Sequence, residues 1–313
     1  MRIQFFSKGP IEQISGGYLY NRYIVEYLQH QKFDVAYYSD PTALRTAIPA
    51  DITIIDGLVL PDCLQFLDAV SGDLVLLLHM PVPVDSTFPP RTRFVTTSEN
   101  MRDELRSSGM MGDTEIAVIA PGVAADWSQR HEYRTTAQRL LCLANYVPGK
   151  GHELLLDVLQ RLTDLNWQLQ MHGNRGLDTS YCEVIDRQIE ARGLQDRVQA
   201  SDAVPHSDVA RLMQASDLLL QFSEHESYSM VTAEAIACGL PVLSSKTGNW
   251  QEFSRSGLVL HFDDLEPANV AGALTQLITN ASSYAALRPA ATTTQRSWID
   301  VGEEFTRWLT LKP

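Results

Sequence analysis

Cysteine is scarce in this chain of 313 residues and shows no metal-binding or disulfide pattern. The four cysteines, Cys63, Cys142, Cys182 and Cys238, lie far apart and form no C-x-x-C pair. Zinc sites and redox motifs use closely spaced cysteines, and small secreted domains carry many of them. We therefore expect reduced, mostly buried thiols in a cytoplasmic protein that has no metal site.

Long apolar runs and an excess of positive charge are also missing. The longest apolar run, residues 74–78, is far shorter than the roughly 20 residues of a transmembrane helix. The first ten residues, MRIQFFSKGP, lack the apolar core of a signal peptide. The formal charge of −13 argues against general nucleic-acid binding, because phosphate contacts require an excess of Lys and Arg. It also weakens the case for adsorption on an anionic membrane, although a local basic patch would still allow peripheral contact.

Short apolar segments alternate with helical segments, and this series occurs twice. The first series predicts strands at 3–6, 33–38, 52–55, 74–78, 94–97 and 116–119, with helices at 18–30 and 100–107. The second predicts strands at 140–144, 167–171, 198–200, 218–222, 241–244 and 259–262, with helices at 152–162, 181–192, 206–215, 229–238, 267–279, 284–287 and 298–311. Strands separated by helices predict parallel sheets connected by right-handed crossovers.

The polar stretch at 123–138 separates the two series and is predicted to be a linker. We therefore expect an α/β protein with two Rossmann-like, doubly wound domains that face each other across a cleft. The predicted boundaries are 1–128 and 129–295, followed by a final helical segment at 296–313. In such folds, ligands bind at the carboxyl ends of the strands. The residues that directly follow each strand therefore carry the functional signal.

Two glycines and a histidine follow strands in the first series. Gly16 and Gly17 directly precede a predicted helix, where glycine lets a ligand approach the backbone and the helix N-terminus attracts phosphate. An ordinary loop and helix cap is the alternative. The pattern is not G-x-G-x-x-G and has no acidic ribose anchor, so it does not indicate NAD. His79 follows the strand at 74–78 and is either a functional or a structural histidine.

Lysine and glycine residues follow strands in the second series. Lys150 lies between two glycines ahead of a helix, in NYVPGKGHE. An ammonium group beside helix-terminal amides suits an anion site, and a solvated turn lysine is the alternative. The next strand ends in HGNRG, which places Gly173 at a strand terminus.

The segment 224–242, EHESYSMVTAEAIACGLPV, carries three glutamates ahead of a buried strand. Ser229 is the predicted N-cap of a helix, and the amides of Ser229, Met230 and Val231 are expected to be unpaired donors at its positive end. That arrangement suits a diphosphate. Glu226, on the loop, and Glu234, on the helix, could accept hydrogen bonds from sugar or ribose hydroxyls. The alternative is a capped surface helix with acidic residues in its first turn.

Residues 223–242 closely resemble the signature of retaining GT-B glycosyltransferases, specifically glycosyltransferase family 4. That signature has two glutamates separated by seven residues, and here it reads Glu226, SYSMVTA, Glu234 and then AIACGLPV. Other segments agree in order: SGGYLYN, LLLHMP, TSENMRDEL, AVIAPGV, VPGKG and SDLLLQFS. The resemblance covers nearly the whole chain.

The resemblance implies a GT-B fold in which the segment 296–313 crosses back to the N-terminal domain. It implies transfer of a sugar, with retention of configuration, from a nucleotide sugar to an acceptor hydroxyl. The acceptor would be a glycan, a lipid-linked sugar or a small molecule, and the process glycan, polysaccharide or glycolipid synthesis. No metal ion or cofactor is expected.

The resemblance also implies residue roles. Lys150 would hold the donor diphosphate, Glu234 the ribose, and Glu226 the hydroxyls of the donor sugar. His79 would lie near the reacting centre. The remaining implied donor-site residues are Gly16, Gly17, Asn145, Gly173, Val204, Pro205, Ser229, Met230 and Val231, of which Val204 and Pro205 would frame the base.

One departure from the family pattern bears on activity. Ala144 and Asn145 stand where the family usually has Gly-Arg, so one diphosphate-neutralising charge is missing. A neutral hydrogen bond is about half as strong as a charge-assisted one. Arg175 is a candidate to replace this cation. The departure keeps open a nucleotide-sugar-binding subunit with weak catalysis. A sugar-nucleotide epimerase or phosphorylase on the same fold is a further alternative, because fold alone does not determine function.

Overall fold

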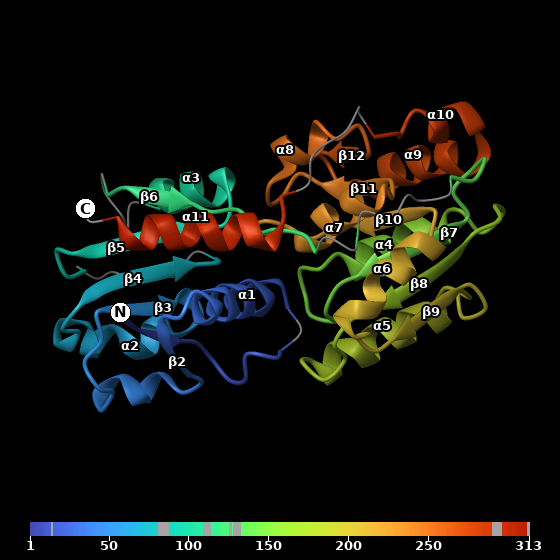
Figure 1. The fold of residues 1–313 in the computed structure, drawn as a ribbon. Coiled ribbons are helices and arrows are strands. Elements are labelled where there is room, and N and C mark those ends of the chain that lie inside the picture. The colour runs from blue at the N-terminus through green and yellow to red at the C-terminus, as the bar shows by residue number, and fades with distance from the viewer. Residues whose placement is uncertain are drawn as a thin grey trace. The chain divides into compact units, whose positions relative to one another are not determined.

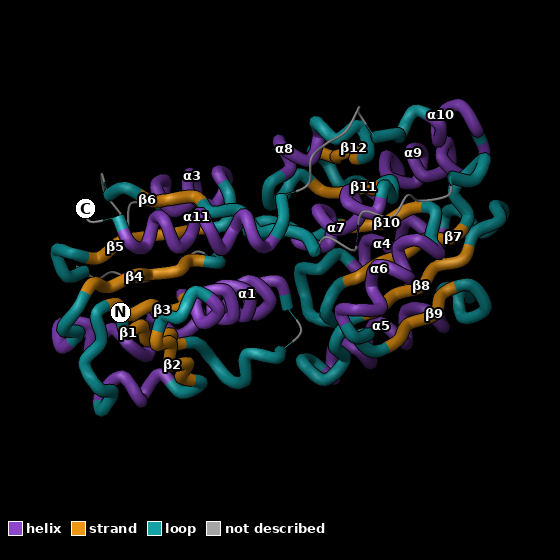
Figure 2. The backbone as a smooth tube through the Cα atoms, viewed as in Figure 1, coloured by secondary structure: helices purple, strands orange, loops and turns teal. Residues whose placement is uncertain are grey.

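The protein forms two compact units, each built around one sheet (Figures 1 and 2). The computed structural model describes residues 1–13, 15–80, 88–108, 114–124, 127, 133–289 and 296–311. Unit 1 comprises Met1–Gly122 and Arg296–Pro313, and unit 2 comprises Val123–Gln295. Each unit contains a six-stranded sheet whose neighbouring strands are all parallel. The predicted α/β class is confirmed.

The sheet of unit 1 has the strand order β2-β1-β3-β4-β5-β6. Its strands are β1 (Arg2–Phe6), β2 (Asp34–Tyr38), β3 (Ile52–Asp56), β4 (Asp73–Leu78), β5 (Thr92–Thr96) and β6 (Ile116–Val118). Its α-helices are α1 (Gly16–His30), α2 (Leu60–Cys63), α3 (Glu99–Ser107) and α11 (Trp298–Thr310). Short 3-10 helices occupy Pro41–Arg45, Gly57–Val59 and Leu64–Ala69.

The helices α1 and α11 lie side by side in unit 1 (Figure 1). The Trp298 ring stacks on Tyr23 with 4.2 Å between ring centroids. A methyl group at Gly302 would lie 2.2 Å from an atom of the Tyr27 ring, so glycine permits the close approach of the two helices. Helix α11, from the last part of the chain, therefore packs against α1 within unit 1.

The sheet of unit 2 has the strand order β12-β11-β10-β7-β8-β9. Its strands are β7 (Arg139–Leu143), β8 (Gln168–His172), β9 (Val198–Ser201), β10 (Leu218–Gln221), β11 (Val242–Ser245) and β12 (Val259–Phe262). Its helices are α4 (His152–Gln160), α5 (Thr179–Ala191), α6 (His206–Ala215), α7 (Met230–Cys238), α8 (Trp250–Ser254), α9 (Pro267–Thr279) and α10 (Ala281–Ala285).

Helices cover both faces of this second sheet. Leu140 and Cys142 of β7 pack in a cluster with residues of α4, α5 and α9. Leu141, between them in sequence, packs in a separate cluster with residues of α6, α7 and α8. Alternate residues of a strand point to opposite faces, so a continuous apolar run indicates a strand buried on both sides. Unit 2 is therefore doubly wound.

Each sheet has a point at which the chain reverses its direction of travel across the strands. In unit 2 the chain moves outward from β7 to β8 and β9, then returns to place β10 on the other side of β7. In unit 1 the corresponding point lies between β1 and β3. The loops that follow the two flanking strands diverge there, and ligands of open α/β sheets bind at such switch points.

Three expectations about the elements need correction. Helix α1 begins at Gly16, so the two glycines form its first turn instead of a preceding loop. Val123 and Trp127, expected in a polar linker, are buried in the core of unit 2, and the rest of that stretch lies partly outside the described residues. The last short helix is α10 at Ala281–Ala285 instead of 284–287.

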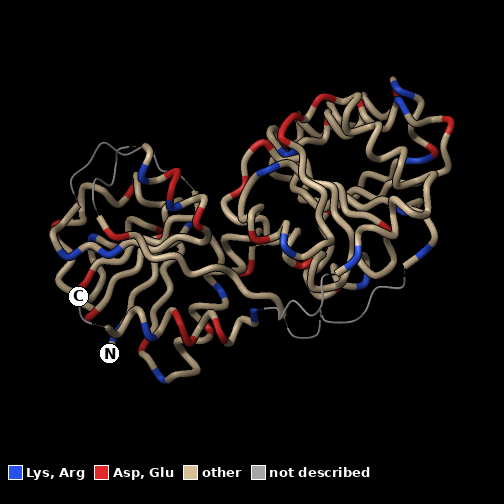
Figure 3. Tube along the Cα trace, turned by 90° about the horizontal axis from the view of Figure 1, so that it is seen from above, with Lys and Arg blue, Asp and Glu red and all other residues tan. Residues whose placement is uncertain are grey.

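The cysteines, the charged residues and the helix lengths can be compared with what the composition led us to expect. All four cysteines are free and buried, as predicted. Figure 3 shows acidic and basic residues interspersed along both units. In the described ranges of the chain, no helix combines the length and the apolar content needed to cross a bilayer.

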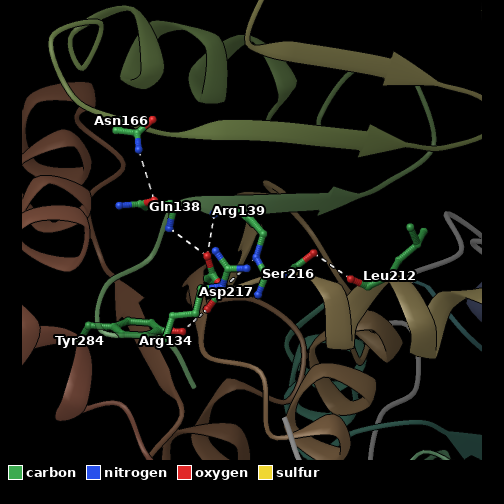
Figure 4. Close-up of polar contacts among 8 residues, drawn as sticks. All are labelled: Arg134, Gln138, Arg139, Asn166, Leu212, Ser216, Asp217 and Tyr284. Atoms are coloured by element: carbon green, nitrogen blue, oxygen red, sulfur yellow. Dashed lines mark hydrogen bonds and ion pairs between the residues drawn. The ribbon is translucent and has the colours of Figure 1, made fainter. Parts of the chain in front are cut away.

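Buried Asp217 ties the start of β10 to the start of β7 (Figure 4). Its carboxylate accepts hydrogen bonds from the amides of Gln138 (3.1 Å) and Arg139 (2.8 Å). It also accepts one from Nη2 of Arg139 at 2.6 Å. The Tyr284 hydroxyl donates to the Asp217 carbonyl at 2.7 Å. Burial raises the pKa of Asp217, but the hydrogen bonds from Arg139 and the two amides outweigh it and hold the pKa below its usual value.

We expect Asp217→Asn to lower the free energy of unfolding by about 2–3 kcal/mol at pH 7, because it leaves a charge-assisted network incomplete. A lowered pKa gives stability that is present above the ordinary Asp value and lost as pH falls through the folded-state pKa. The difference between the two proteins should therefore shrink below about pH 4, as denaturant melts at several pH values would measure. Asp208→Asn, which removes an exposed pair with Arg211, is the control and should change stability by less than about 1 kcal/mol. Equal effects of both substitutions would contradict this assignment.

Candidate functional site

The loop after β7 places Lys150 between two glycines in left-handed conformations. Gly149 has φ 82° and Gly151 has φ 76°. A methyl group at Gly151 would lie 2.3 Å from the Phe222 carbonyl oxygen, so the loop passes very close to the end of β10. Gly151 is also the N-cap of α4 and has no side chain to cap it. Lys150 therefore lies beside a positive helix end at the switch point of the second sheet.

Lys150 contacts Glu226 across this switch point. Its Nζ lies 2.7 Å from Oε1 of Glu226, and Gln221 donates to the same oxygen at 3.2 Å. The amide of Glu224 donates to the Gly149 carbonyl at 2.8 Å, which fixes the two loops to each other. The structure thus brings together two predicted site residues from opposite sides of the switch point. An ammonium group has three N–H donors, so Lys150 can still donate to a ligand. Glu224 itself is exposed.

The start of α7 differs from the predicted cap. Ser229 occupies the N-cap position, but its hydroxyl lies 2.8 Å from Oγ1 of Thr232 and caps no helix amide. Within the described residues, the amides of Ser229, Met230 and Val231 have no hydrogen-bond acceptor. The expectation of three unpaired donors therefore agrees with the structure, whereas the side-chain cap was wrong.

Ser229 is held in a strained conformation. With φ 73° it is one of two non-glycine residues with positive φ in the described part of the chain. The loop after β11 supports this turn, because Asn249 donates its amide to the Tyr228 carbonyl at 3.0 Å. A methyl group at Gly248 would lie 2.4 Å from the same carbonyl oxygen. Left-handed non-glycine residues cost about 1–3 kcal/mol and concentrate at functional sites, so this turn has the features of a built anion site.

Glu234 is buried in α7, and among the described residues its side chain has one hydrogen-bonded partner, His206. Only 6% of the residue is exposed, and its Oε1 lies 2.8 Å from Nε2 of His206. His206 is the first residue of α6, and its ring stacks on Trp127 with 5.0 Å between centroids. Burial raises the pKa of Glu234, and the hydrogen bond from His206 opposes this effect. Val204 and Pro205 directly precede His206 in the sequence. The predicted site residues Val204, Pro205 and Glu234 are therefore all next to this histidine.

Asn145 and Gly173 hold neighbouring loops together. The Asn145 side-chain oxygen accepts a hydrogen bond from the amide of Asn174 at 3.1 Å. A methyl group at Gly173 would lie 1.8 Å from the Ala144 carbonyl oxygen, so only glycine fits there. Asn145 can still donate hydrogen bonds to a ligand through its NH₂ group.

Arg175, the candidate to replace the missing cation, is paired with a carboxylate in this structure. Its Nη2 lies 2.5 Å from Oδ2 of Asp186, and its guanidinium lies 4.8 Å from the centroid of the Tyr146 ring. The charge of Arg175 is therefore paired with the Asp186 carboxylate. Lys150 is the cation that the loops after β7 and β10 share.

Unit 1 carries a second polar cluster at its own switch point. His79, directly after β4, is 9% exposed, and its Nε2 lies 2.9 Å from Oδ1 of Asn21. Asn21 donates through Nδ2 to Asp56 at 2.6 Å. A methyl group at Gly17 would lie 3.5 Å from the His79 ring, which places the first turn of α1 against this histidine. Burial lowers the pKa of His79, and the charge of Asp56 opposes this effect only in part, so the imidazole is neutral at pH 7.

Four residues in these clusters were not predicted: Asn21, Asp56, His206 and Gln221. Asp56 directly follows the predicted strand 52–55 and satisfies the same rule that selected His79. Asn21 is a polar residue among the apolar positions of α1, which was a weaker signal. His206 carried only the weak signal of starting a predicted helix, and Gln221 carried none, since their importance lies in their contacts with Glu234 and Glu226.

Comparison with solved structures identifies the architecture as that of GT-B glycosyltransferases. Sucrose-phosphate synthase from Thermosynechococcus elongatus superposes with a TM-score of 0.79 at 14% identity, covering 98% of each chain. Anabaena Alr3699/HepE in complex with UDP and glucose gives 0.78 at 17% identity, covering 99% of this chain and all of that one. The two parallel sheets and their helices therefore have the GT-B fold.

The chain belongs to the family Glycosyl transferases group 1, whose pattern matches residues 124–294, just over half of the chain. The GDP-mannose:cellobiosyl-diphosphopolyprenol alpha-mannosyltransferase of Xanthomonas campestris is 30% identical over 155 residues, which are 49% of this chain and 40% of that protein. The D-inositol 3-phosphate glycosyltransferase of Corynebacterium diphtheriae is 28% identical over 170 residues, with the same two coverages. The chain thus spans less than half the length of these relatives.

Proposed function

We propose that this protein is a glycosyltransferase that moves a sugar from a nucleotide sugar to an acceptor hydroxyl with retention of configuration. The observation that carries this proposal is the contact of Lys150 with Glu226 at the switch point of unit 2, beside the uncapped start of α7. A cation and free amides suit a diphosphate, and the carboxylate suits sugar hydroxyls. The family assignment supports the same reaction class.

Each polar group then has one task. Lys150 and the amides of Ser229, Met230 and Val231 stabilise the charge that develops on the leaving nucleoside diphosphate. Glu234 accepts hydrogen bonds from the ribose hydroxyls, and Val204 and Pro205 frame the base. Glu226 accepts hydrogen bonds from hydroxyls of the donor sugar, and Gly16 and Gly17 allow close approach to the diphosphate.

The chemistry needs no protein nucleophile in this proposal. The acceptor hydroxyl attacks the anomeric carbon from the face that the nucleotide leaves, and its proton passes to the leaving phosphate oxygen. His79, neutral at pH 7, orients the donor sugar or the acceptor. We propose that the reaction is metal-independent, takes place in the cytoplasm and serves glycan, polysaccharide or glycolipid synthesis, with a glycan, lipid-linked or small-molecule acceptor.

A weakly catalytic nucleotide-sugar-binding protein is the second candidate. Asn145 stands where a charged residue is usual, and Arg175 is paired with Asp186. With one cation fewer, stabilisation of the leaving diphosphate would be weaker while binding through Glu234 remained. Binding without turnover in the experiment below would favour this candidate.

A thermal-shift screen against UDP-, GDP-, ADP- and dTDP-sugars tests the donor site. A ligand that binds only the native state at 100 times its Kd stabilises by about 2.7 kcal/mol, which should raise Tm by several degrees. We expect one nucleotide series to do so. Incubation of that donor with glycan and lipid-linked acceptors, followed by proton NMR of the anomeric signal, should show a product with the donor's configuration. An unchanged rate in excess EDTA is expected, whereas an inverted product or a nucleotide sugar that is only epimerised would contradict the proposal.

A further inference from the structure

The side chains of the polar cluster in unit 1 are almost completely buried. Ser7, Asn21 and Asp56 are fully buried, and His79 nearly so. Buried polar groups are costly unless each is hydrogen-bonded. Ser7 directly follows β1, Asn21 lies in α1, Asp56 ends β3 and His79 directly follows β4, so the fold brings them together from four separate places. The assignment of donors and acceptors in these hydrogen bonds determines which ring nitrogen of His79 carries the proton.

Asp56 fixes the orientation of the Asn21 amide. The Asp56 carboxylate accepts from the Ser7 hydroxyl at 2.8 Å, from the Leu58 amide at 2.9 Å and from Nδ2 of Asn21 at 2.6 Å. A carboxylate only accepts hydrogen bonds, so the Asn21 group that faces it must be the NH₂ group. The Asn21 oxygen consequently faces His79, at 2.9 Å from Nε2.

The Asn21 oxygen in turn fixes the proton of His79. An amide oxygen is only an acceptor, so Nε2 of His79 must carry the hydrogen. A neutral imidazole has one N–H group, which leaves Nδ1 with a lone pair. The ring cannot easily rotate, because Tyr20 lies edge-on to it with 5.3 Å between centroids and the first turn of α1 lies against it.

We propose that Asp56 and Asn21 are positioning residues that hold His79 as the Nε2–H tautomer, so that Nδ1 accepts a hydrogen bond from a substrate hydroxyl. This inference rests on the proposed function, which gives His79 a substrate to orient. It also specifies how His79 acts. The neutral amide between Asp56 and His79 cannot take up a proton, so His79 aligns a hydroxyl and is no proton relay to Asp56. The lowered pKa of His79 agrees with this role.

The tautomer can be measured directly by NMR on protein labelled with ¹⁵N-histidine. We expect the two His79 nitrogens, assigned by comparison with His79→Gln, to show a protonated Nε2 and an unprotonated Nδ1. In Asn21→Ala, both shifts should move toward the average of two tautomers. The kcat for transfer should fall about 10-fold or more while the KM for the donor stays within about 2-fold, since only the alignment of a reacting hydroxyl is lost.

Gln4→Leu is the matched control. Gln4 is another buried amide side chain of unit 1, and it donates to the Ile48 carbonyl away from His79. Its loss should destabilise the unit similarly but leave the His79 signals and kcat unchanged. If Asn21→Ala does not fold, Asp56→Asn provides the same test, because an amide at position 56 no longer dictates which way Asn21 points.

The inference and the proposed function can fail separately. A native His79 with the proton on Nδ1, or His79 signals that are unchanged in folded Asn21→Ala, would overturn the positioning role. An Asn21-dependent Nε2–H tautomer combined with full transfer by His79→Gln would support the positioning chain and remove His79 from the reaction.

Discussion

Replacement of Lys150 by methionine is expected to reduce kcat/KM for sugar transfer by about 10²- to 10³-fold, the loss typical when one preorganised donor to a developing negative charge is removed. Lys150 lies at the switch point of unit 2, and Asn145 stands where the family resemblance leads us to expect a second cation. The dependence on Lys150 should therefore be greater than in a site with two charges. Most of the loss should be in kcat, because charge on the diphosphate increases as the glycosidic bond breaks.

Lys246→Met is a closely matched control. The Lys246 side chain is 31% exposed and lies 2.5 Å from Asp263, whereas the Lys150 side chain is 30% exposed and lies 2.7 Å from Glu226. Both lysines follow strands of the same sheet. The control should change kcat/KM by less than about 3-fold, because the ion pair of Lys246 with Asp263 is mostly exposed. Initial rates with the donor from the thermal-shift screen would measure both variants, and similar losses in the two would show that Lys150 acts through general charge or stability.

The strands were predictable because a parallel strand buried on both faces gives a continuous apolar run. All twelve were placed to within two residues of the observed ends, including Leu218–Gln221 and Val259–Phe262. Short elements were missed: α2 and α8 have four and five residues, too few to show a helical period. The burial of Trp127 was also unpredictable, because its packing depends on His206, which is distant in sequence.

Candidate site residues could be selected from the sequence where they follow strands or start helices. That rule selected Lys150, which the structure places just before α4, and His79, which it places directly after β4. It could not reveal which side chains pair with which. His206 and Glu234 are 28 positions apart, and Asn21 and His79 are 58 apart, and each pair meets only through tertiary packing. The orientation of the Asn21 amide could not be predicted from the sequence either, since it depends on the contact with Asp56.

Glu234→Gln is expected to weaken donor binding and, at the same time, to stabilise the ligand-free protein. Hydrogen bonds to a charged group contribute about 1.5–3 kcal/mol each, so the Kd of the nucleotide sugar should rise about 10- to 100-fold. Glutamine keeps an oxygen for His206, whose Nε2 lies 2.8 Å away, and removes the buried charge. A structural residue would show the opposite pattern, with lower stability and unchanged affinity.

The effect of Glu234→Gln on stability depends on pH. Burial raises the pKa of Glu234 in the folded protein, so its contribution to stability is favourable at low pH and is lost as pH rises through the folded-state pKa. At pH 7.5 the native protein therefore carries the cost of a buried charge, and Glu234→Gln should have the higher Tm. This advantage should shrink as pH falls toward the ordinary Glu value of about 4.3.

Glu224→Gln distinguishes this effect from a general loss of negative charge. Glu224 is exposed and lies ten residues before Glu234, in the loop that also carries Glu226. Calorimetric titration and thermal melts of the control should give a Kd within about 2-fold and an unchanged Tm, because an exposed carboxylate is already solvated. A Glu234→Gln variant that binds the donor normally and melts earlier than the native protein would assign Glu234 to the packing of α7 against α6 and would leave the ribose without its proposed acceptor.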